Sequence, residues 1–241
     1  MIGIGTIINV AGILCGGLLG LAFGKRLPER FQSILIQSAS ICVLFLGIGG
    51  CMEKMLQITQ DGLASSGSIM MILCFVLGSV VGELINIDRR LEQFGAWLKE
   101  KTGSGGDTSF VDAFATSSLT VCIGAMAVVG AVQDGIYGNY SILAAKAVLD
   151  LIIILVMTAS IGKGCIFSAI PVGVFQGLVT LLAVFVEPFL TEPALANLSL
   201  TGSIMIFCIG VNLIWNMKIR VANMLPTLLF AVLWDFLPWF T

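Results

Sequence analysis

The sequence predicts an all-α membrane protein, a polytopic bundle of about eight transmembrane helices with little chain outside the bilayer. Composition, a series of long apolar runs and the placement of Lys and Arg lead to this fold class. Hydrophobic residues make up 58% of the 241 residues and charged residues only 11%. A soluble domain carries about 25% charged residues, so this chain is too poor in them to cover a water-exposed surface. We expect the lipid bilayer to surround it.

The chain contains eight apolar runs of the length that a membrane span requires. A spanning helix needs about 20 mostly apolar residues. Helices are expected because lipid cannot satisfy free backbone groups. The predicted spans cover residues 3–24, 33–52, 68–87, 110–132, 141–161, 165–187, 199–216 and 221–239. The connections are short, so residues 1–241 are expected to form a single transmembrane domain.

The basic residues predict how the spans are oriented, because Lys and Arg are enriched in cytoplasmic loops. With eight spans, most basic residues fall on one side, in alternate loops. These are Lys25, Arg26, Arg30, Arg89, Arg90, Lys99, Lys101, Lys163, Lys218 and Arg220. Lys54 and Lys146 are the exceptions. Both termini are therefore expected outside the cytoplasm. Aromatic residues gather near predicted span ends, as is typical of membrane interfaces: Tyr137, Tyr140, Trp215, Trp234 and Trp239.

Residues 88–101 form the most polar helical stretch. Leu91, Phe94 and Leu98 share one helical face, and the charges lie elsewhere. This pattern favours a short amphipathic helix on the cytoplasmic membrane surface, followed by a flexible linker over 102–107. A solvated extension of the third span is the alternative.

Weak internal repeats are predicted over residues 1–54, 68–134 and 165–216. The first two units begin with glycines four apart and continue through a charged turn into a second helix. The third unit begins five spans after the first, so its first helix would cross the membrane in the opposite sense. Inverted repeats are typical of secondary transporters. A shared apolar composition is the other explanation for the similarity.

Glycines spaced by four make a flat stripe on a helix, which lets two backbones approach closely. The stripe residues are Gly12, Gly16, Gly20 and Gly24 in the first span and Gly78 and Gly82 in the third. Packing within the bundle or at a dimer seam is one interpretation, and a backbone-lined pathway is the other. We expect a homodimer that packs partly through the stripe of the first span.

Lys146 and Asp150 are the most informative polar residues, because charged groups inside spans are costly and mark functional sites. They lie four residues apart on one helical face and can pair. At 1.5 Å per residue, Asp150 lies near the midplane of a core about 30 Å thick. We interpret the pair as a proton or cation site, and an ion pair that only fixes packing is the alternative.

Other polar residues inside the spans extend this candidate site for a substrate or ion. They are Asn9, Ser38, Ser40, Thr116, Ser117, Ser118, Gln176, Asn212 and Asn223. Hydroxyls often bond back to their own helix, and the amides have the alternative role of holding helices together. Pro171 and Pro226 mark helix breaks or harmless helix starts, and residues 124–135 are rich enough in glycine to unwind.

Several function classes find no support in the sequence. It lacks GxxxxGK[ST], HExxH and GxSxG, so neither ATP-driven transport nor hydrolysis is indicated. The chain has no His, and its seven Cys form no CxxC pair. We predict no enzymatic activity, no cofactor and no disulfide framework, and leave a metal site undecided. The net charge of −2 gives no reason to expect a nucleic-acid partner.

Several motifs together resemble those of one bacterial family. They are Gly5-Thr-Ile-Ile-Asn9, Gly24-Lys-Arg-Leu-Pro-Glu-Arg30, Cys122-Ile-Gly-Ala-Met-Ala127, Gln133-Asp-Gly135, Lys146-Ala-Val-Leu-Asp150 and Lys218-Ile-Arg-Val-Ala-Asn-Met-Leu-Pro226. In these the chain resembles the YqgA/YdfK-like bacterial inner-membrane proteins over nearly its whole length. The resemblance implies a multi-pass protein of the cytoplasmic membrane. It also implies a role in transport, but it supplies no substrate.

The leading hypothesis is a secondary transporter or channel-like permease for a small solute or ion, coupled to protons or Na⁺. The alternative is a non-transporting membrane scaffold or a partner subunit of a larger complex. The second, fourth, seventh and eighth predicted spans would supply hydroxyls and amides around the charged pair, and a polar cavity between the second, fourth, fifth and seventh spans would favour transport. A dry, fully packed bundle with a large flat exposed face would favour the scaffold.

The predicted orientation can be tested with a reporter fused after Thr241. The ten-to-two distribution of basic residues predicts reporter activity in the periplasm, because both termini should lie outside the cytoplasm. Activity found only in the cytoplasm would contradict the eight-span topology.

Overall fold

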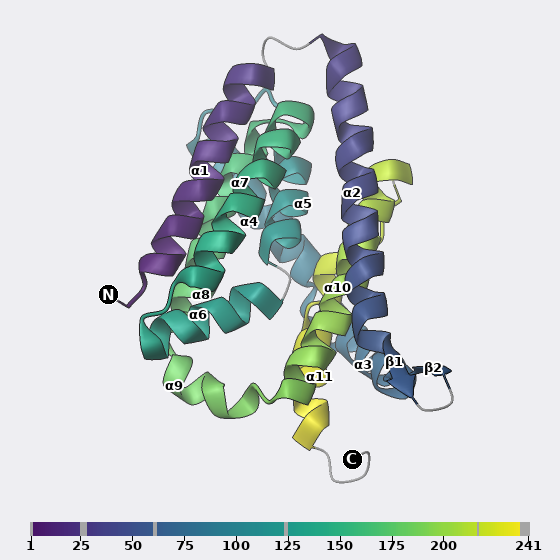
Figure 1. The fold of residues 1–241 in the computed structure, drawn as a ribbon. Helices are drawn as coiled ribbons and strands as arrows, with labels where there is room; N and C mark the ends of the chain where they lie inside the picture. Colours follow the sequence, from purple (N-terminus) through teal and green to yellow (C-terminus); the bar gives the residue numbers. More distant parts are fainter. Residues whose placement is uncertain (1, 25–27, 60–61, 123–124, 216, 237–241) are drawn as a thin grey trace. The chain divides into compact units, whose positions relative to one another are not determined.

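The computed structural model describes residues 2–24, 28–59, 62–122, 125–215 and 217–236. Lys25, Arg26, Gly124 and Trp239, which entered the sequence analysis, lie outside these residues. The described chain is mostly helical (Figure 1). Its α-helices are α1 Ile4–Gly24, α2 Glu29–Met55, α3 Ser68–Ile85, α4 Ile87–Lys101, α5 Phe110–Cys122, α6 Ala125–Tyr137, α7 Ser141–Ile161, α8 Ala169–Leu181, α9 Ala183–Val186, α10 Glu192–Trp215 and α11 Pro226–Leu233.

Short 3-10 helices and one β-hairpin complete the described elements. The 3-10 helices are η1 Lys163–Ser168, η2 Glu187–Phe189, η3 Val221–Met224 and η4 Trp234–Phe236. Strands β1 Leu56–Thr59 and β2 Gly62–Ser65 pair antiparallel, with Leu56 opposite Ser65. This hairpin lies in the loop that follows the second predicted span.

Six of the described helices are long and apolar enough to cross a membrane. They are Ile4–Gly24, Ser33–Met55, Ser68–Ile85, Ser141–Ile161, Lys163–Leu181 and Glu192–Trp215. The bent pair α5 and α6 makes a seventh span if it is counted as one. The last predicted span appears as a shorter apolar segment, Val221–Phe236. A multi-pass membrane protein is therefore confirmed at the level of fold class, and the count of eight is not.

The span predicted over 110–132 is a broken helix rather than a continuous one. The axes of α5 and α6 differ by 62°. The stretch 124–135 is rich enough in glycine to unwind, but its described part is helical, as α6 from Ala125 onward. The pair nevertheless follows the length of α7. Ser109, before α5, donates to the carbonyl of Ile161 at the end of α7, and Gly130 of α6 packs on Leu143 near its start.

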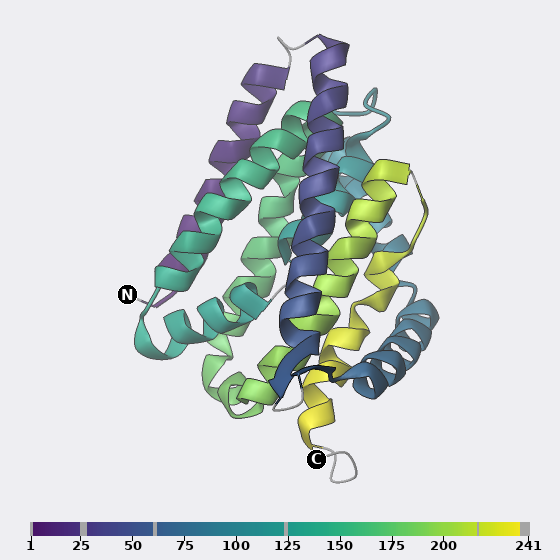
Figure 2. The same cartoon turned by 45° about the vertical axis from the view of Figure 1, so that its right-hand side comes forward.

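The chain divides into two compact units, and each is described separately. Unit 1 comprises Met1–Ser40 and Arg89–Glu187, and unit 2 comprises Ile41–Asp88 and Pro188–Thr241. In unit 2 the C-terminal part of α2 packs on α10, as Figure 2 shows, with Gly47 against Phe207. The stripe glycines of α3, Gly78 and Gly82, lie against Thr227 and Asn223. The predicted repeat units and their inversion stay predictions.

In unit 1 the glycine stripe of α1 lies against α7, and the two helices run side by side in Figure 1. The facing pairs are Gly12 with Ala147, Gly16 with Leu151, Gly20 with Leu155, and Gly24 with Ala159. Residue numbers rise together along both helices, so α1 and α7 are parallel. The stripe is occupied by the same chain and is not a free homodimer seam, which corrects the expected role of this face. A homodimer through another face stays a prediction.

The parallel packing of α1 and α7 supports counting α5 and α6 as one broken span. Two membrane helices run in the same direction only when an odd number of crossings separates them. Between α1 and α7, α2 and α3 supply two crossings, and the broken pair supplies the third. The described residues thus contain six candidate spans, and seven if the bent pair α5 and α6 is counted as one.

The stretch predicted as an amphipathic helix forms α4 and packs on α5. Asn86, with φ of 54°, ends α3, so α4 is a separate helix and not a continuation of the third span. Leu98 is buried with Phe110 and Phe114. Phe94 also contacts the Phe114 ring at a centroid distance of 5.8 Å. The predicted apolar face is thus used for packing inside unit 1.

The α1–α7 seam predicts that a single methyl group at Gly16 is destabilising. A Cβ there would overlap the backbone carbonyl of Leu151, and backbone cannot move aside as a flexible side chain can. We expect Gly16→Ala to cost about 1–3 kcal/mol, and Gly16→Leu to prevent a monodisperse fold. The measurement is thermal unfolding of the detergent-solubilised protein.

Gly177 of α8 is the matched control, because a Cβ at that position meets nothing within 4 Å. Gly177→Ala should leave the unfolding midpoint unchanged or raise it, since Ala favours helix. Equal midpoints for the wild type and both Gly→Ala variants would show that the seam does not depend on close backbone approach.

Candidate functional site

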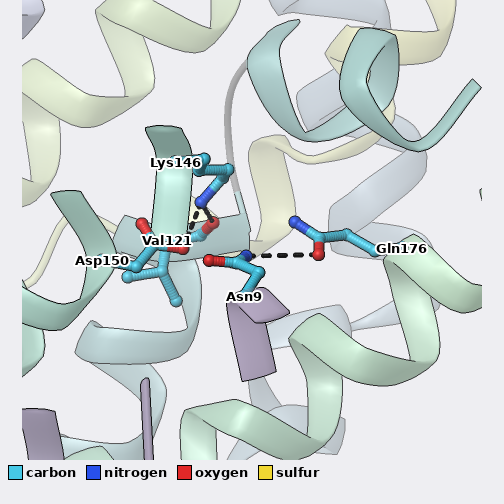
Figure 3. Close-up of polar contacts among 5 residues, drawn as sticks. All are labelled: Asn9, Val121, Lys146, Asp150 and Gln176. Atoms are coloured by element: carbon cyan, nitrogen blue, oxygen red, sulfur yellow. Dashed lines mark hydrogen bonds and ion pairs between the residues drawn. The ribbon is translucent and has the colours of Figure 1, made fainter. Parts of the chain in front are cut away.

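Four of the predicted site residues meet in unit 1 (Figure 3). Lys146 and Asp150 come from α7, Asn9 from α1 and Gln176 from α8. All four side chains are buried, with exposed fractions of 6%, 3%, 0% and 0% respectively. Because the glycine stripe holds α1 close to α7, the amide of Asn9 reaches the charged pair on the neighbouring helix.

Lys146 joins Asp150 to the end of the broken span. Its Nζ donates to Asp150 Oδ2 and to the backbone carbonyl of Val121, at 2.8 Å. Val121 lies one residue before the end of α5. The last carbonyls of a helix have no partner within the helix and carry partial negative charge. The ammonium therefore neutralises both a carboxylate and a helix C-terminus.

The depth of this pair in the membrane makes its charges expensive. Asp150 is the tenth residue of α7, which begins at Ser141. At 1.5 Å per residue, it lies about 14 Å along that helix, near the middle of a core about 30 Å thick. An isolated acid at this depth costs about 3 kcal/mol. The contact with Lys146 offsets that cost. Removing one partner alone leaves the other charge buried and uncompensated.

The two amides form the next link of the network. Asn9 Nδ2 donates to Gln176 Oε1 at 3.2 Å, and Figure 3 shows the Asn9 amide between Gln176 and Asp150. Asn9 Oδ1 and Gln176 Nε2 have no hydrogen-bond partner among the described residues. Half a turn of an amide exchanges its donor and acceptor. Asn9 can thus turn either its N–H group or its carbonyl oxygen toward Asp150. The N–H suits an ionised carboxylate, and the oxygen suits a carboxyl group that carries a proton or a bound cation.

The buried polar groups continue from Asn9 toward the start of α1. One turn away, the hydroxyls of Thr6 and Thr180 lie 3.4 Å apart. Next to Thr6, the backbone N–H of Gly5 donates to Asp134 Oδ2 at 2.9 Å. We call this set the polar row: Asp134, Thr6, Thr180, Asn9, Gln176, Lys146 and Asp150. Each member has at most 8% of its surface exposed.

Three members of the polar row were missed by the sequence analysis. Asp134 was placed just beyond a span predicted to end at residue 132, so its burial was not expected. Thr6 and Thr180 are single hydroxyls, which carry little signal alone. A usable signal was their spacing: Thr6 is three residues from Asn9, and Thr180 four from Gln176, so each pair shares a helical face.

The predicted hydroxyl cluster of α5 is mostly committed to its own helix. Ser117 Oγ donates to the carbonyl of Ala113 at 2.7 Å. The carbonyl of Thr116 accepts a hydrogen bond from Thr120. Ser118, buried at 3% exposure, has a hydroxyl without a hydrogen-bond partner among the described residues. Ser117 thus bonds to a carbonyl of its own helix, as hydroxyls inside helices often do. Ser118 stays a candidate for binding a ligand.

Asn212 and Asn223 belong to unit 2, and both amides bind the backbone or side chains of loops there. Asn212 makes two hydrogen bonds to the backbone of Ile219, at 2.8 and 3.0 Å. Asn223 donates to Glu83 at 2.7 Å and accepts from the N–H of Asp88 at the start of α4. Burial raises the pKa of the Asp88 carboxyl, an effect that the Arg220 charge opposes.

The remaining sequence candidates are dispersed. Ser38 of α2 is exposed, whereas Ser40 is buried. Pro171 and Pro226 both lie in the first turn of a helix, α8 and α11, and each helix follows a 3-10 turn. Pro is tolerated there, because its missing N–H would have no helical partner.

Comparisons with known proteins place the chain in a family. The model of the family described as "Protein of unknown function (DUF554)" matches residues 4–236. The chain belongs to this family. It is similar to the uncharacterized membrane protein YdfK of Bacillus subtilis (strain 168), with 26% identity over 225 residues, covering 93% of this chain and 92% of YdfK.

A second relative of this DUF554 protein is the uncharacterized protein YqgA of Escherichia coli (strain K12). The two are 26% identical over 233 residues, covering 95% of this chain and 94% of YqgA. No solved structure matches the chain. The predicted resemblance to YqgA/YdfK-like proteins is confirmed.

The polar row determines what this DUF554 site can bind. Its groups are two carboxylates, one ammonium, two amides and two hydroxyls. Among the described residues, no three His, Cys, Asp or Glu side chains are placed to hold a metal ion. Oxygen groups beside a carboxylate suit a proton or a hard monovalent cation, and the amides suit a small polar solute.

The ion pair predicts unequal effects of single and double substitution on stability. Lys146→Met leaves Asp150 buried without a counter-charge, so it should cost about 3–5 kcal/mol. Lys146→Met with Asp150→Leu removes both charges and should recover most of that loss, since apolar residues often replace a buried pair. Unfolding of the detergent-solubilised variants measures both. If the double variant were no more stable than Lys146→Met, the two charges would not be coupled.

Proposed function

We propose that this protein is a secondary transporter or channel-like permease of the bacterial inner membrane, which moves a small solute or ion coupled to a proton or Na⁺. The observation that carries the proposal is the contact of Lys146 with both Asp150 and the Val121 carbonyl. It joins a buried charge to the break in a spanning helix.

A broken span and a buried charge support transport for one physical reason. Irregular backbone at membrane depth is stable only when protein or a polar cavity surrounds it. In secondary transporters, the ends of discontinuous helices near the midplane coordinate the coupling ion or substrate. Here the C-terminal end of α5 adds partial negative charge beside the Asp150 carboxylate. The combination favours a positively charged ligand at this point.

Lys146 fits this proposal as an internal cation. While its ammonium contacts Asp150, the site is neutral, and the bundle does not contain an uncompensated charge. A proton or cation that binds Asp150 competes with Lys146 for the same oxygen atoms. Long Lys side chains can extend toward the membrane surface, which gives the displaced ammonium a place to go. We propose no catalytic step for this chain.

The test is a flux assay in liposomes, with wild-type protein and Asp150→Asn. Candidate ions and small metabolites are applied as gradients. We expect Asp150→Asn to abolish flux while the protein still inserts and can be purified, with a lower unfolding midpoint, because the amide keeps the shape but can neither hold a cation nor balance the charge of Lys146. The expected loss is at least 100-fold, or to the background of empty liposomes.

Thr201→Val is the matched control. Thr201 of α10 is fully buried and its hydroxyl donates to the Asn197 carbonyl of its own helix, so the variant should keep the wild-type flux. Normal flux in Asp150→Asn would remove the charged pair from the mechanism. Absence of flux in the wild type for every solute tested would instead favour a scaffold or a partner subunit.

A further inference from the structure

Asp134 is a second buried carboxylate, and unlike Asp150 it has no cationic partner among the described residues. Its side chain is 0% exposed. Oδ2 accepts the N–H of Gly5, and Oδ1 has no hydrogen-bond partner. Rotation of the side chain cannot relieve this, because both oxygens of a carboxylate are acceptors.

The surroundings of Asp134 offer little to offset a negative charge. The Gly5 and Leu143 positions lie on one side of it. At the adjacent Gly135, the backbone of Thr180 and the methyl group of Ala183 approach closely. Ion pairs in the described part of the chain join Lys54 to Glu53, Lys146 to Asp150 and Arg220 to Glu83. An ionised Asp134 in this position requires a bound cation or ordered water.

Three members of the polar row have a buried polar atom without a partner among the described residues. Seven buried side-chain atoms lack a partner within the ranges that the structure describes, and three belong to Asp134, Asn9 and Gln176. Buried polar groups without partners point to bound water or ions. From Gly5 to Asn9 the row advances about 6 Å along α1, at 1.5 Å per residue.

The Asp134 end of the row is near exposed polar residues. Three residues after Asp134, Tyr137 closes α6 and is 69% exposed. Its hydroxyl donates to the carboxylate of Glu187, which is also exposed, at 3.1 Å. The row therefore runs from this exposed end of unit 1 to the Lys146–Asp150 pair inside it.

We infer that Asp134 binds a monovalent cation, either a proton or an alkali ion, and passes it along the polar row to Asp150. This inference rests on the proposed transport function and makes the coupling species a cation. Asp134 is the first group that binds the cation. The hydroxyls of Thr6 and Thr180 come next along the row, and the amides of Asn9 and Gln176 adjoin Asp150. Ordered water would complete the hydrogen bonds that the unmet atoms leave open.

A helix cap is the competing role for Asp134, because its Oδ2 satisfies an N–H in the first turn of α1. Asp134→Asn separates the two roles. The Asn oxygen still accepts the Gly5 N–H and keeps the shape, but the charge is gone. A cap requires only the acceptor, whereas a cation site requires the charge.

The first experiment measures proton and alkali-ion flux in liposomes for wild type, Asp134→Asn and Asp150→Asn. Asp112→Asn, which removes a carboxylate of α5 outside the polar row, is the control and should match the wild type. We expect at least 10-fold lower cation flux in Asp134→Asn with an unchanged unfolding midpoint. A pH-sensitive dye inside the liposomes reports protons, and Na⁺, K⁺ and Li⁺ gradients report alkali ions.

The second experiment does not require flux. A hydrophobic carbodiimide forms a stable adduct with protonated carboxyl groups in apolar surroundings, and mass spectrometry locates the adduct. We expect labelling at Asp134 in the wild type. Protection by Na⁺, K⁺ or Li⁺ identifies an alkali ion, and labelling that none of them changes identifies a proton.

The outcomes separate this inference from the proposed function. If Asp134→Asn carries flux within two-fold of wild type while Asp150→Asn carries none, the transport function stands and the role of Asp134 as a cation-binding group is wrong. The same conclusion follows if the wild type moves only uncharged solutes without a cation. If nothing is transported but alkali ions protect Asp134, the cation site stands without transport. If nothing is transported and Asp134 is not labelled, both are wrong.

Discussion

The close approach of α1 and α7 is the contact on which the rest of unit 1 depends. Gly16 and Gly20 bring the α1 backbone against the carbonyls of Leu151 and Leu155. This seam sets the rotation of α1 about its axis, so that Asn9 points toward α7 and α8. A larger residue at each stripe position would separate the two helices and leave the amide of Asn9 without its partner. Apolar packing therefore determines where the polar groups meet.

The pairing of charges then determines which buried polar groups are free to bind a ligand. Lys146 satisfies Asp150 and the end of α5 together, so the pair is stable without any ligand. Asp134 receives only one backbone N–H from the described residues. In a bilayer, where an unmet polar group costs several kcal/mol, this difference distinguishes a self-contained site from one that needs water or an ion.

The sequence predicted the membrane fold class, the charged pair, and Asn9 and Gln176 as polar candidates, because each residue type is costly in an apolar span wherever it packs. It did not predict that these two amides, rather than those of the other spans, lie beside the pair. It did not predict the break after Cys122 or the burial of Asp134. Apolar residues surround the break, and hydropathy cannot distinguish a straight span from a bent one. Asp134 follows Gln133 at the end of the apolar run, where burial is not expected. Nor did glycine spacing show whether the α1 stripe faced another chain or, as observed, α7. That choice depends on tertiary packing between segments far apart in sequence.

The contact between Lys146 and the Val121 carbonyl also constrains how the protein is made. Helix α5 leaves the ribosome before α7, so its C-terminal carbonyls enter the membrane before their partner exists. Until Lys146 arrives, water or the insertion machinery must satisfy them. The Val121 carbonyl therefore gains its Lys146 partner only after α7 has inserted, so this contact is a late step in biogenesis.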